Sequence, residues 1–349
     1  MVEPEVHPPR IVLRRVPFDP AAWDAIVAAH PEAEVYHSTG WLEYLSRSQA
    51  AEPVVAEVWF EGRRAGHFVG AIVRRGGIRI LGSPLRGWTT QCMGFLLDDG
   101  IDRRAVADAL PPFAFHDLRC LHVELSDRRL GVAQMTGARY QAEVGGTYVV
   151  DLEPAEDVIL GRMRATTRNY IRQATRDGVV IEQATGEDFA DDYYEQLADV
   201  FGRQGLGPTY GIDRVRQLIS ALQPTGQLLL LRARESSGAC VATLVSVGRG
   251  TTAVLWGVAF SRSHTRTHPN ELLHWEAIRR WRAMGATRYD MGGGGAYKAK
   301  YGGSEAPTVH FYCSRWGVLG VARSGVRRIV LGRQIISGTR RRLGGTGGA

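Results

Sequence analysis

Apolar positions in the first half of the chain first recur at helical spacing and then fall in runs typical of strands. This pattern predicts helices followed by strands. Segments with helical spacing come first, and runs rich in β-branched residues, separated by Gly-containing turns, come next. A further helix and a further strand complete the half. The predicted helices are residues 21–29, 40–46 and 102–110, and the predicted strands are 54–60, 67–73, 78–81 and 120–125.

The second half repeats this order, which indicates an internal duplication. Two helices precede three strands joined by short turns, and a helix and a strand follow. The predicted helices are residues 187–202, 212–222 and 271–284, and the predicted strands are 227–233, 240–247, 251–258 and 288–291. This order resembles the GNAT acyltransferase fold written twice. We therefore expect an α/β protein with mixed sheets and two tandem GNAT-like domains, although fold alone does not give function.

Segment 144–152 reads as a strand that enters a linker, so we place the domain boundary near residue 150. The first domain is then 1–150 and the second 151–314, with a late strand at 308–313. We expect segment 315–349 to pack back on the first domain. No long heptad pattern interrupts the second half, which predicts the absence of a coiled-coil arm.

The helix predicted at 271–284 shows the clearest caps. Pro269 suits a first turn and Gly285 ends the pattern. Segment 267–270 therefore lies at the N-terminus of this helix, whose free backbone N–H groups either attract an anion or belong to an ordinary capped helix. The apolar stripe expected to be buried is Leu273, Ala277, Trp281 and Met284.

Composition indicates a globular chain with 44% hydrophobic and 23% charged residues, and a length of 349 suggests two domains or one domain built from a duplicated unit. No run of 18 apolar residues occurs, and the N-terminus lacks a secretory pattern, so we expect a cytoplasmic protein. The four cysteines are far apart and are expected to be reduced thiols, with no metal site.

The net charge of +7 favours anionic partners without choosing among them. The basic C-terminal tail could contact a membrane surface or RNA, or form a solvated helix. Its arginines are Arg323, Arg327, Arg328, Arg333, Arg340, Arg341 and Arg342.

Lysine occurs only at Lys298 and Lys300, inside the glycine-rich stretch 292–303, whereas 41 of the 43 basic residues are arginine. A compact ammonium can approach a developing oxyanion or a phosphate oxygen more closely than a guanidinium can. Codon bias that leaves chance survivors is the alternative explanation. The stretch is neither a Walker loop nor a dinucleotide fingerprint. If it is extended, the two lysines face one side and Tyr297 and Tyr301 face the other.

Three segments carry a more specific resemblance, namely 270–278, 285–293 and 297–302. Together they resemble the second-domain signature of the Fem-type (FemABX) aminoacyltransferases, in which an aromatic-Lys-x-x-aromatic-Gly run follows Tyr-Asp-x-Gly-Gly. Segment 168–174 is similar to the basic helix that opens the family's second domain. The resemblance covers residues 160–312, and the first half shares mainly the order of elements and residues 37–41.

The resemblance implies transfer of an acyl group, often an aminoacyl group from aminoacyl-tRNA, to the amine of a peptide-like acceptor. Lys298 falls on the family's essential lysine, and no cofactor beyond the co-substrate is implied. A fixed ammonium would stabilise the carbonyl oxyanion or hold the donor's terminal phosphate. Asp290, Glu305 and Tyr297 are nearby candidates for the base that accepts the proton of the amine, and substrate or solvent is the alternative acceptor of that proton. The expected substrate-binding residues are Tyr297, Lys300, Arg168, Asn169, Arg172, Arg203, Tyr210, Asn270, Gly293 and Gly294.

Members that act on nucleotide-linked cell-wall peptides carry a lysine shortly after the early Trp. No lysine follows Trp41 here, which argues against a UDP-linked peptidoglycan precursor as the acceptor.

Arginines recur every four residues at 164, 168, 172 and 176, on one helix face that could follow an RNA backbone or simply be solvated. Arg203 and Tyr210 lie in a loop that could line the acceptor cleft. The histidines form no ligand set; His274 is expected at the surface or in a cap, and His310 half-buried and hydrogen-bonded.

Three functions remain open from the sequence: a tRNA-dependent aminoacyltransferase acting on a cell-wall precursor or a peptidyl natural product, an acyl-CoA-dependent N-acyltransferase, and a non-catalytic RNA-binding module.

Overall fold

The computed structural model describes residues 11–202, 205–261 and 266–315 of the 349. Contacts between Cα atoms divide these residues into two compact units. Unit 1 contains the described residues up to Gly145 and those from Thr308 onward, and unit 2 runs from Gly146 to Pro307. The sequence placed the divisions near 150 and 314.

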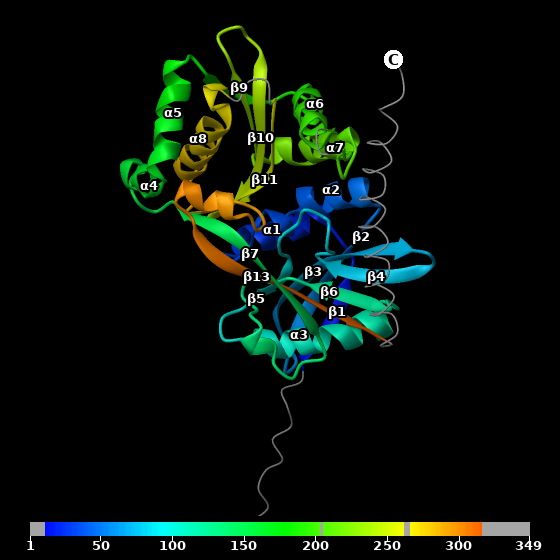
Figure 1. Ribbon diagram of the computed structural model, residues 1–349. Helices are drawn as coiled ribbons and strands as arrows, with labels where there is room; N and C mark the ends of the chain where they lie inside the picture. Colours follow the sequence, from blue (N-terminus) through cyan, green and yellow to red (C-terminus); the bar gives the residue numbers. More distant parts are fainter. Residues whose placement is uncertain (1–10, 203–204, 262–265, 316–349) are drawn as a thin grey trace, which may run out of the picture. The chain divides into compact units, whose positions relative to one another are not determined.

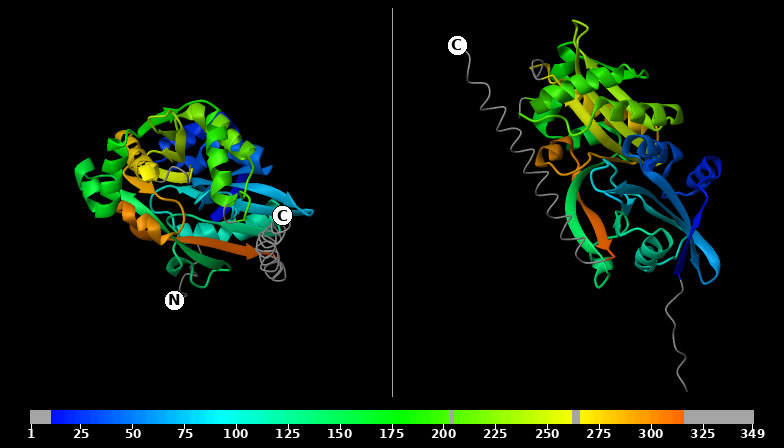
Figure 2. Two further views of the ribbon diagram at one scale, coloured as in Figure 1. Left: turned by 45° about the horizontal axis from the view of Figure 1, so that its top comes forward. Right: turned by 90° about the vertical axis from the view of Figure 1, so that its right-hand side faces the viewer.

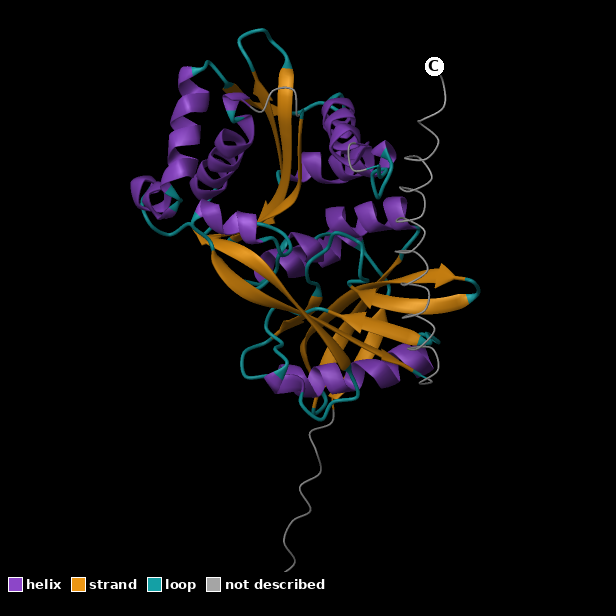
Figure 3. Ribbon diagram, in the orientation of Figure 1, coloured by secondary structure: helices purple, strands orange, loops and turns teal. Residues whose placement is uncertain are grey.

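Unit 1 is a mixed sheet with the strand order β1-β2-β3-β4-β6-β13. Neighbouring strands are antiparallel except for β4 and β6, which are parallel, and β5 pairs with β3 outside this order. Figure 3 distinguishes the strands from the helices. The elements are β1 (Ile11–Val16), α1 (Pro20–Ala29), η1 (Val35–His37), α2 (Thr39–Gln49), β2 (Glu52–Phe60), β3 (Arg63–Arg75), β4 (Ile78–Ser83), β5 (Gly94–Leu97), α3 (Arg103–Pro112), the π-helical turn η2 (Phe113–Asp117), β6 (His122–Leu125), η3 (Ala133–Met135) and β13 (Ser304–Ser314).

Side-chain caps start the helices of unit 1. The carboxylates of Asp19 and Asp102 accept from backbone N–H groups in the first turns of α1 and α3, and the Ser38 hydroxyl accepts from the third residue of α2. Alternating residues of β2, Val54 and Val58 among them, are buried in the core with α3. Capping and period-2 burial therefore explain why these predicted elements are confirmed.

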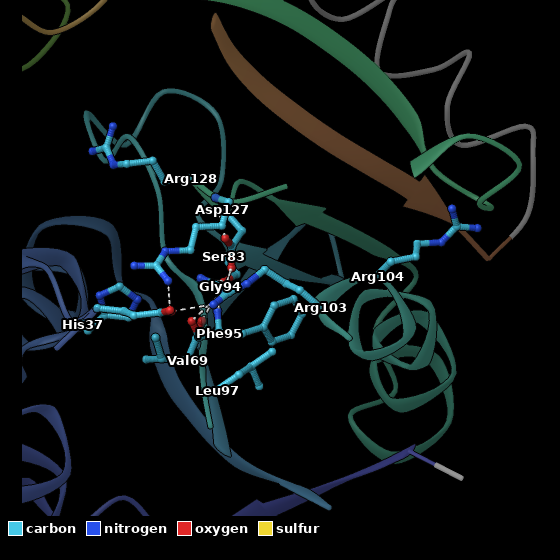
Figure 4. A network of polar contacts seen from close by, with 12 residues as sticks. His37, Val69, Ser83, Gly94, Phe95, Leu97, Arg103, Arg104, Asp127 and Arg128 are labelled. Carbon is cyan, nitrogen blue, oxygen red and sulfur yellow. Dashed lines mark hydrogen bonds and ion pairs between the residues drawn. The ribbon is translucent and has the colours of Figure 1, made fainter. Parts of the chain in front are cut away.

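A buried polar network crosses the sheet of unit 1 (Figure 4). The Asp127 carboxylate accepts hydrogen bonds from the backbone N–H of Phe95 at 3.2 Å and from the Arg103 guanidinium at 2.6 Å. The Ser83 hydroxyl accepts from the N–H of Gly94 at 2.8 Å. These bonds satisfy buried groups that would otherwise carry a desolvation cost.

Unit 2 repeats the arrangement with the strand order β8-β9-β10-β11-β12-β7. Only β11 and β12 are parallel. Helices α5 and α8 lie on one face of β9, β10 and β11, and α6 and α7 lie on the other (Figure 1). The elements are β7 (Gln141–Asp151), α4 (Glu156–Arg162), α5 (Ala165–Arg176), β8 (Val180–Ala184), α6 (Phe189–Gly202), α7 (Ile212–Leu222), η4 (Gln223–Thr225), β9 (Leu228–Arg234), β10 (Cys240–Arg249), β11 (Thr252–Phe260), α8 (Pro269–Ala283), β12 (Arg288–Asp290) and η6 (Ala296–Tyr301).

The predicted duplication is confirmed. Strand, helix, helix, three-stranded meander, helix and parallel strand occur in both units, as β1 to β6 and as β8 to β12. The last strand of each sheet comes from a different place in the chain: β13 (orange in Figure 2) pairs with β6 in unit 1, whereas β7 pairs with β12 in unit 2. The longest described helix has 15 residues, so the part of the chain that the structure covers contains no coiled-coil arm.

Helix α8 begins at Pro269, as expected, and Gly285 beyond its end has a φ of +93°. Leu273, Ala277 and Trp281 are buried. Met284 was predicted in the same stripe, but its side chain is 52% exposed. Met284 is the C-cap residue, where the helix has already left the core, so the period no longer applies.

The four cysteines are free thiols. Among the described residues, no helix is both long enough and apolar enough to cross a membrane. The basic tail proposed for a membrane or RNA, and all of segment 315–349 except Arg315, lie outside the described residues.

Candidate active site

The two lysines lie on a short 3₁₀ helix, η6, that follows the end of β12. The N–H of Lys298 donates to the carbonyl of Gly295 at 2.8 Å, and the N–H of Gly302 donates to that of Ala299 at 3.2 Å. The segment is therefore not extended, and the arrangement expected for an extended segment, with lysines and tyrosines on opposite sides, does not apply. The backbone of this segment forms turn hydrogen bonds between nearby residues and not ladder hydrogen bonds to another strand.

Gly302 ends η6 with a φ of +80°. A Cβ atom at this position would lie 3.0 Å from the backbone of Arg162, at the end of α4. Only glycine combines this backbone conformation with such a close approach. The glycine fixes η6 against the junction of α4 and α5, and the N–H of Arg164 donates to the carbonyl of Lys300 at 3.0 Å in the same place.

The Lys298 ammonium is enclosed by the loop that precedes η6. The residue is 7% exposed, and Nζ donates to the carbonyl oxygens of Met291 at 2.8 Å, of Gly292, and of Gly293 at 3.2 Å. An ammonium has three protons, so all three have acceptors. A planar guanidinium could not make this set of bonds from the same position.

Burial lowers the pKa of Lys298, and the negative charge of Asp290 opposes that shift. Asp290 is fully buried on β12 and accepts from the hydroxyl of Thr147 and from the N–H of Gly292 at 3.0 Å. The carboxylate thus organises the first turn of the lysine loop. Of the other two candidate bases, Glu305 is exposed, and burial raises the pKa of Tyr297.

Lys300 faces α8. Its ammonium forms an ion pair of 2.7 Å with Glu271, in the first turn of that helix and next to Asn270. The Oδ1 atom of Asn270 is buried and has no hydrogen-bond partner in the structure. Sequence reasoning missed Glu271, although a carboxylate in the first turn of a helix is a standard position.

The two tyrosines of η6 differ in exposure. Tyr297 is 57% exposed, with its ring centre 5.9 Å from the Lys298 ammonium. Tyr301 is fully buried, and its ring centre lies 4.4 Å from that of His274 on α8. Tyr297 is therefore the aromatic group that a substrate can reach.

His274 is buried, so the prediction of a surface or capping histidine is wrong. The residue is 1% exposed, and neither ring nitrogen has a hydrogen-bond partner in the structure. Burial, followed by the positive charges of Lys300 and Lys298, lowers its pKa to about 3, which keeps the ring neutral. His274, Ile278 and Trp281 recur at helical spacing, and this pattern in the sequence could have indicated burial.

The arginines predicted to bind substrate have different surroundings. Arg168 donates to the carbonyl oxygens of Gly161, at 3.0 Å, and of Met163, so it holds the end of α4. Arg172 is exposed and donates to the side-chain oxygen of Asn169 at 2.9 Å. The prediction of four arginines along one helix is confirmed for α5, with Arg164 as its N-cap residue.

The remaining predicted residues lie in two places. Gly293 and Gly294 are exposed in the lysine loop. The hydroxyl of Tyr210 lies 2.8 Å from that of Tyr193, and its ring centre lies 5.5 Å from that of Trp256 on β11. Arg203 lies outside the described residues. The structure thus brings Lys298, Tyr297, Lys300, Asn270 and Gly293 together around η6 and the start of α8. Tyr210, in the loop before α7, instead belongs to an aromatic cluster with Tyr193 on α6 and Trp256 on β11.

The segment that contains these residues matches a protein family in its sequence. Residues 161–301 match the family described as Acetyltransferase (GNAT) domain. The chain has a GNAT-type acyltransferase fold. The match lies within unit 2 and includes both lysines.

Solved structures extend the likeness to both units. The crystal structure of FemX covers 85% of this chain and 96% of its own, with a TM-score of 0.69 at 13% identity. A tandem GNAT protein from the clavulanic acid biosynthesis pathway covers 87% of this chain and 98% of its own, with a TM-score of 0.52 at 14% identity. The structure of L-PGS from Bacillus licheniformis covers 76% of this chain and 85% of its own, with a TM-score of 0.51 at 14% identity. At these identities the likeness concerns the fold. No curated protein matches the chain.

Proposed function

We propose that this protein is an acyltransferase that moves an amino acid from aminoacyl-tRNA to an amine of a peptide-like acceptor, with Lys298 as its catalytic residue. The observation that carries the proposal is the Lys298 ammonium, which is held by three backbone carbonyls on a GNAT-type fold. Burying a charge in this way is costly, and such groups are retained mostly at functional sites.

The reaction forms one bond and breaks one. The acceptor nitrogen attacks the ester carbonyl of the donor, and a C–N bond forms as the carbonyl oxygen becomes an oxyanion. Collapse of this intermediate breaks the C–O bond to the ribose. The amine loses one proton and the leaving ribose oxygen gains one, so no other reactant is needed.

Lys298 would stabilise the oxyanion. Its bond to Gly293 is, at 3.2 Å, longer than the bond to Met291, and Gly293 lies on the exposed side of the loop. A substrate oxygen that replaces the Gly293 carbonyl would take over one proton of the ammonium while the other two bonds hold Nζ in place. Preorganised donors of this kind need no reorganisation as charge develops.

The surrounding residues would position the two substrates. Tyr297 offers an exposed ring beside the ammonium, and Lys300, fixed by Glu271, offers a second positive charge for a phosphate of the donor. The buried oxygen of Asn270 can accept a hydrogen bond at the start of α8. The carboxylate of Asp290, already bonded to Thr147 and Gly292, would support the loop.

The tRNA donor is supported by the Fem-type signature around the lysines and by the likeness to FemX over most of both chains. A cytoplasmic location stays a prediction. An acyl-CoA donor is the second candidate, because the matched family is described as an acetyltransferase domain and one structural neighbour is a tandem GNAT protein whose structure was solved without AcCoA.

A transfer assay separates these candidates. The purified protein is incubated with a panel of peptide amines and either a mixture of charged tRNAs or a set of acyl-CoA thioesters, and the products are identified by mass spectrometry. The proposal expects an amide product only with charged tRNA, and its loss after ribonuclease treatment. Products only with acyl-CoA would support the second candidate. Binding of tRNA with no product from either donor would favour a non-catalytic RNA-binding module.

A further inference from the structure

Helix α5 and its N-cap carry arginines for which the described part of the chain offers no acidic partner. No Asp or Glu occurs between residues 158 and 176, and among the residues that the structure describes no carboxylate pairs with Arg164, Arg172 or Arg176. Arginines on the neighbouring helices are paired: Arg162 with Asp151, and Arg279 with Glu156. The exposed guanidinium groups of α5 thus form a local excess of positive charge.

A stacked aromatic pair borders the same surface. Tyr170, on α5, is 38% exposed, and its ring lies 3.8 Å from that of His268 with an angle of 14° between the planes. His268 is the N-cap residue of α8 and has a φ of +50°. The pair is a flat platform beside unpaired cations, which is the combination that binds single-stranded nucleic acid.

Both features connect to the lysine helix. The N-cap residue of α5, Arg164, donates its backbone N–H to the carbonyl of Lys300. His268 lies three residues before Glu271, which forms the ion pair with the Lys300 ammonium. A strand that lies along α5 toward its N-terminus would therefore reach η6.

We propose that this α5 surface, made of Arg164, Tyr170, Arg172, Arg176 and His268, binds RNA, with phosphates on the arginines and one unpaired base on the Tyr170–His268 stack. The inference rests on the proposed function for its partner, the single-stranded 3′ end and adjoining acceptor stem of the donor. Arg168 is excluded because its guanidinium is bonded to carbonyls at the end of α4.

The test measures binding by fluorescence anisotropy with two labelled, uncharged RNA hairpins of the same stem. One ends in four unpaired 3′ nucleotides, and the other is blunt. The wild-type protein should bind the first hairpin more tightly by about 5- to 100-fold, the effect of one stacked base. Tyr170→Ala should abolish this difference and leave the blunt hairpin unaffected, whereas Tyr170→Phe should preserve it.

The arginines are tested through the salt dependence. Replacing Arg172 and Arg176 together by glutamine should weaken binding of both hairpins, and should reduce the slope of log affinity against log salt by about 1 to 2. Arg216→Gln is the matched control, because Arg216 is similarly exposed in unit 2 but is paired with Asp191 on another helix. The control should leave affinity and slope unchanged.

Two results would overturn the inference. One is that the hairpin affinities do not change in the Tyr170 and arginine variants. The other is that the protein binds phosphatidylglycerol vesicles through these residues and does not bind RNA. The outcome is independent of the transfer assay. If the protein transfers an amino acid from charged tRNA but the variants bind the hairpins as the wild type does, the proposed α5 surface is wrong and the proposed function is supported. If hairpin binding depends on the α5 surface but no transfer occurs, the surface is supported and the proposed function is wrong.

Discussion

The ammonium of Lys298 lies 2.8 Å from the carbonyl oxygen of Met291, the first residue after β12. This contact ties the only lysine-bearing segment of the chain to the end of β12, which lies between β11 and β7 in the sheet of unit 2. A side chain on a flexible glycine-rich stretch is thereby held by the rigid part of the fold. A side chain positioned in this way retains its geometry while another molecule binds beside it.

The close approach of Gly302 to Arg162 predicts a large cost for any side chain. Gly302→Ala should lower the free energy of unfolding by about 1 kcal/mol for the positive φ, and by a further 1–3 kcal/mol for the contact with the Arg162 backbone. Gly285→Ala is the matched control, because Gly285 also has a positive φ but has nothing within 4 Å of the added Cβ. Urea denaturation gives both values, and equal losses would contradict the packing described for η6.

His274 predicts a pH dependence of stability. Its folded pKa of about 3 lies below the ordinary value of 6.5, so between these values the unfolded chain binds a proton that the folded chain does not. Its contribution is fully present above pH 6.5 and is lost as the pH falls toward 3, by at most about 1.4 kcal/mol per pH unit.

The comparison of wild type with His274→Gln isolates this contribution, because the pKa values of other buried histidines such as His37 are also lowered. Urea unfolding between pH 4 and 7 should show a shallower dependence for the variant. Identical pH dependences for the two proteins would show that His274 is not held neutral in the folded state.

The Asp127 network predicts that one carboxylate contributes strongly to the stability of unit 1. Asp127→Ala would leave the N–H of Phe95 without its acceptor and take one of two carboxylate partners from Arg103, at a cost of about 3–5 kcal/mol. Asp99→Ala, at an exposed aspartate, should change stability by less than about 0.5 kcal/mol. Thermal unfolding measures both, and a small effect at Asp127 would contradict the network.

The sequence predicted the order of elements well, because period-2 and helical patterns arise from the burial of one face. It missed β1 and β8, which are short edge strands of six and five residues with one buried residue each. It did not predict the helical turn of η6, because a glycine-rich segment carries no period and its shape depends on contacts such as that of Gly302 with Arg162.

The candidate site was predicted in part. The scarcity of lysine directed attention to Lys298, and its neighbours Lys300 and Asn270 do lie nearby. The ion pair of Lys300 with Glu271 and the contact of His274 with Tyr301 depend on how α8 faces η6, which no local pattern encodes. Arg168 matched the basic pattern, yet the structure uses it to hold carbonyl groups.

The most direct test of the central claim is the rate of amide formation under single-turnover conditions, with saturating donor, for wild type, Lys298→Ala and Lys298→Arg. The account predicts that both variants fold, as judged by thermal unfolding, and that their rate of amide formation falls by about 10²- to 10³-fold. Neither variant places a compact ammonium among the carbonyl groups of Met291, Gly292 and Gly293. A folded Lys298→Ala protein that forms the amide at the wild-type rate would contradict it.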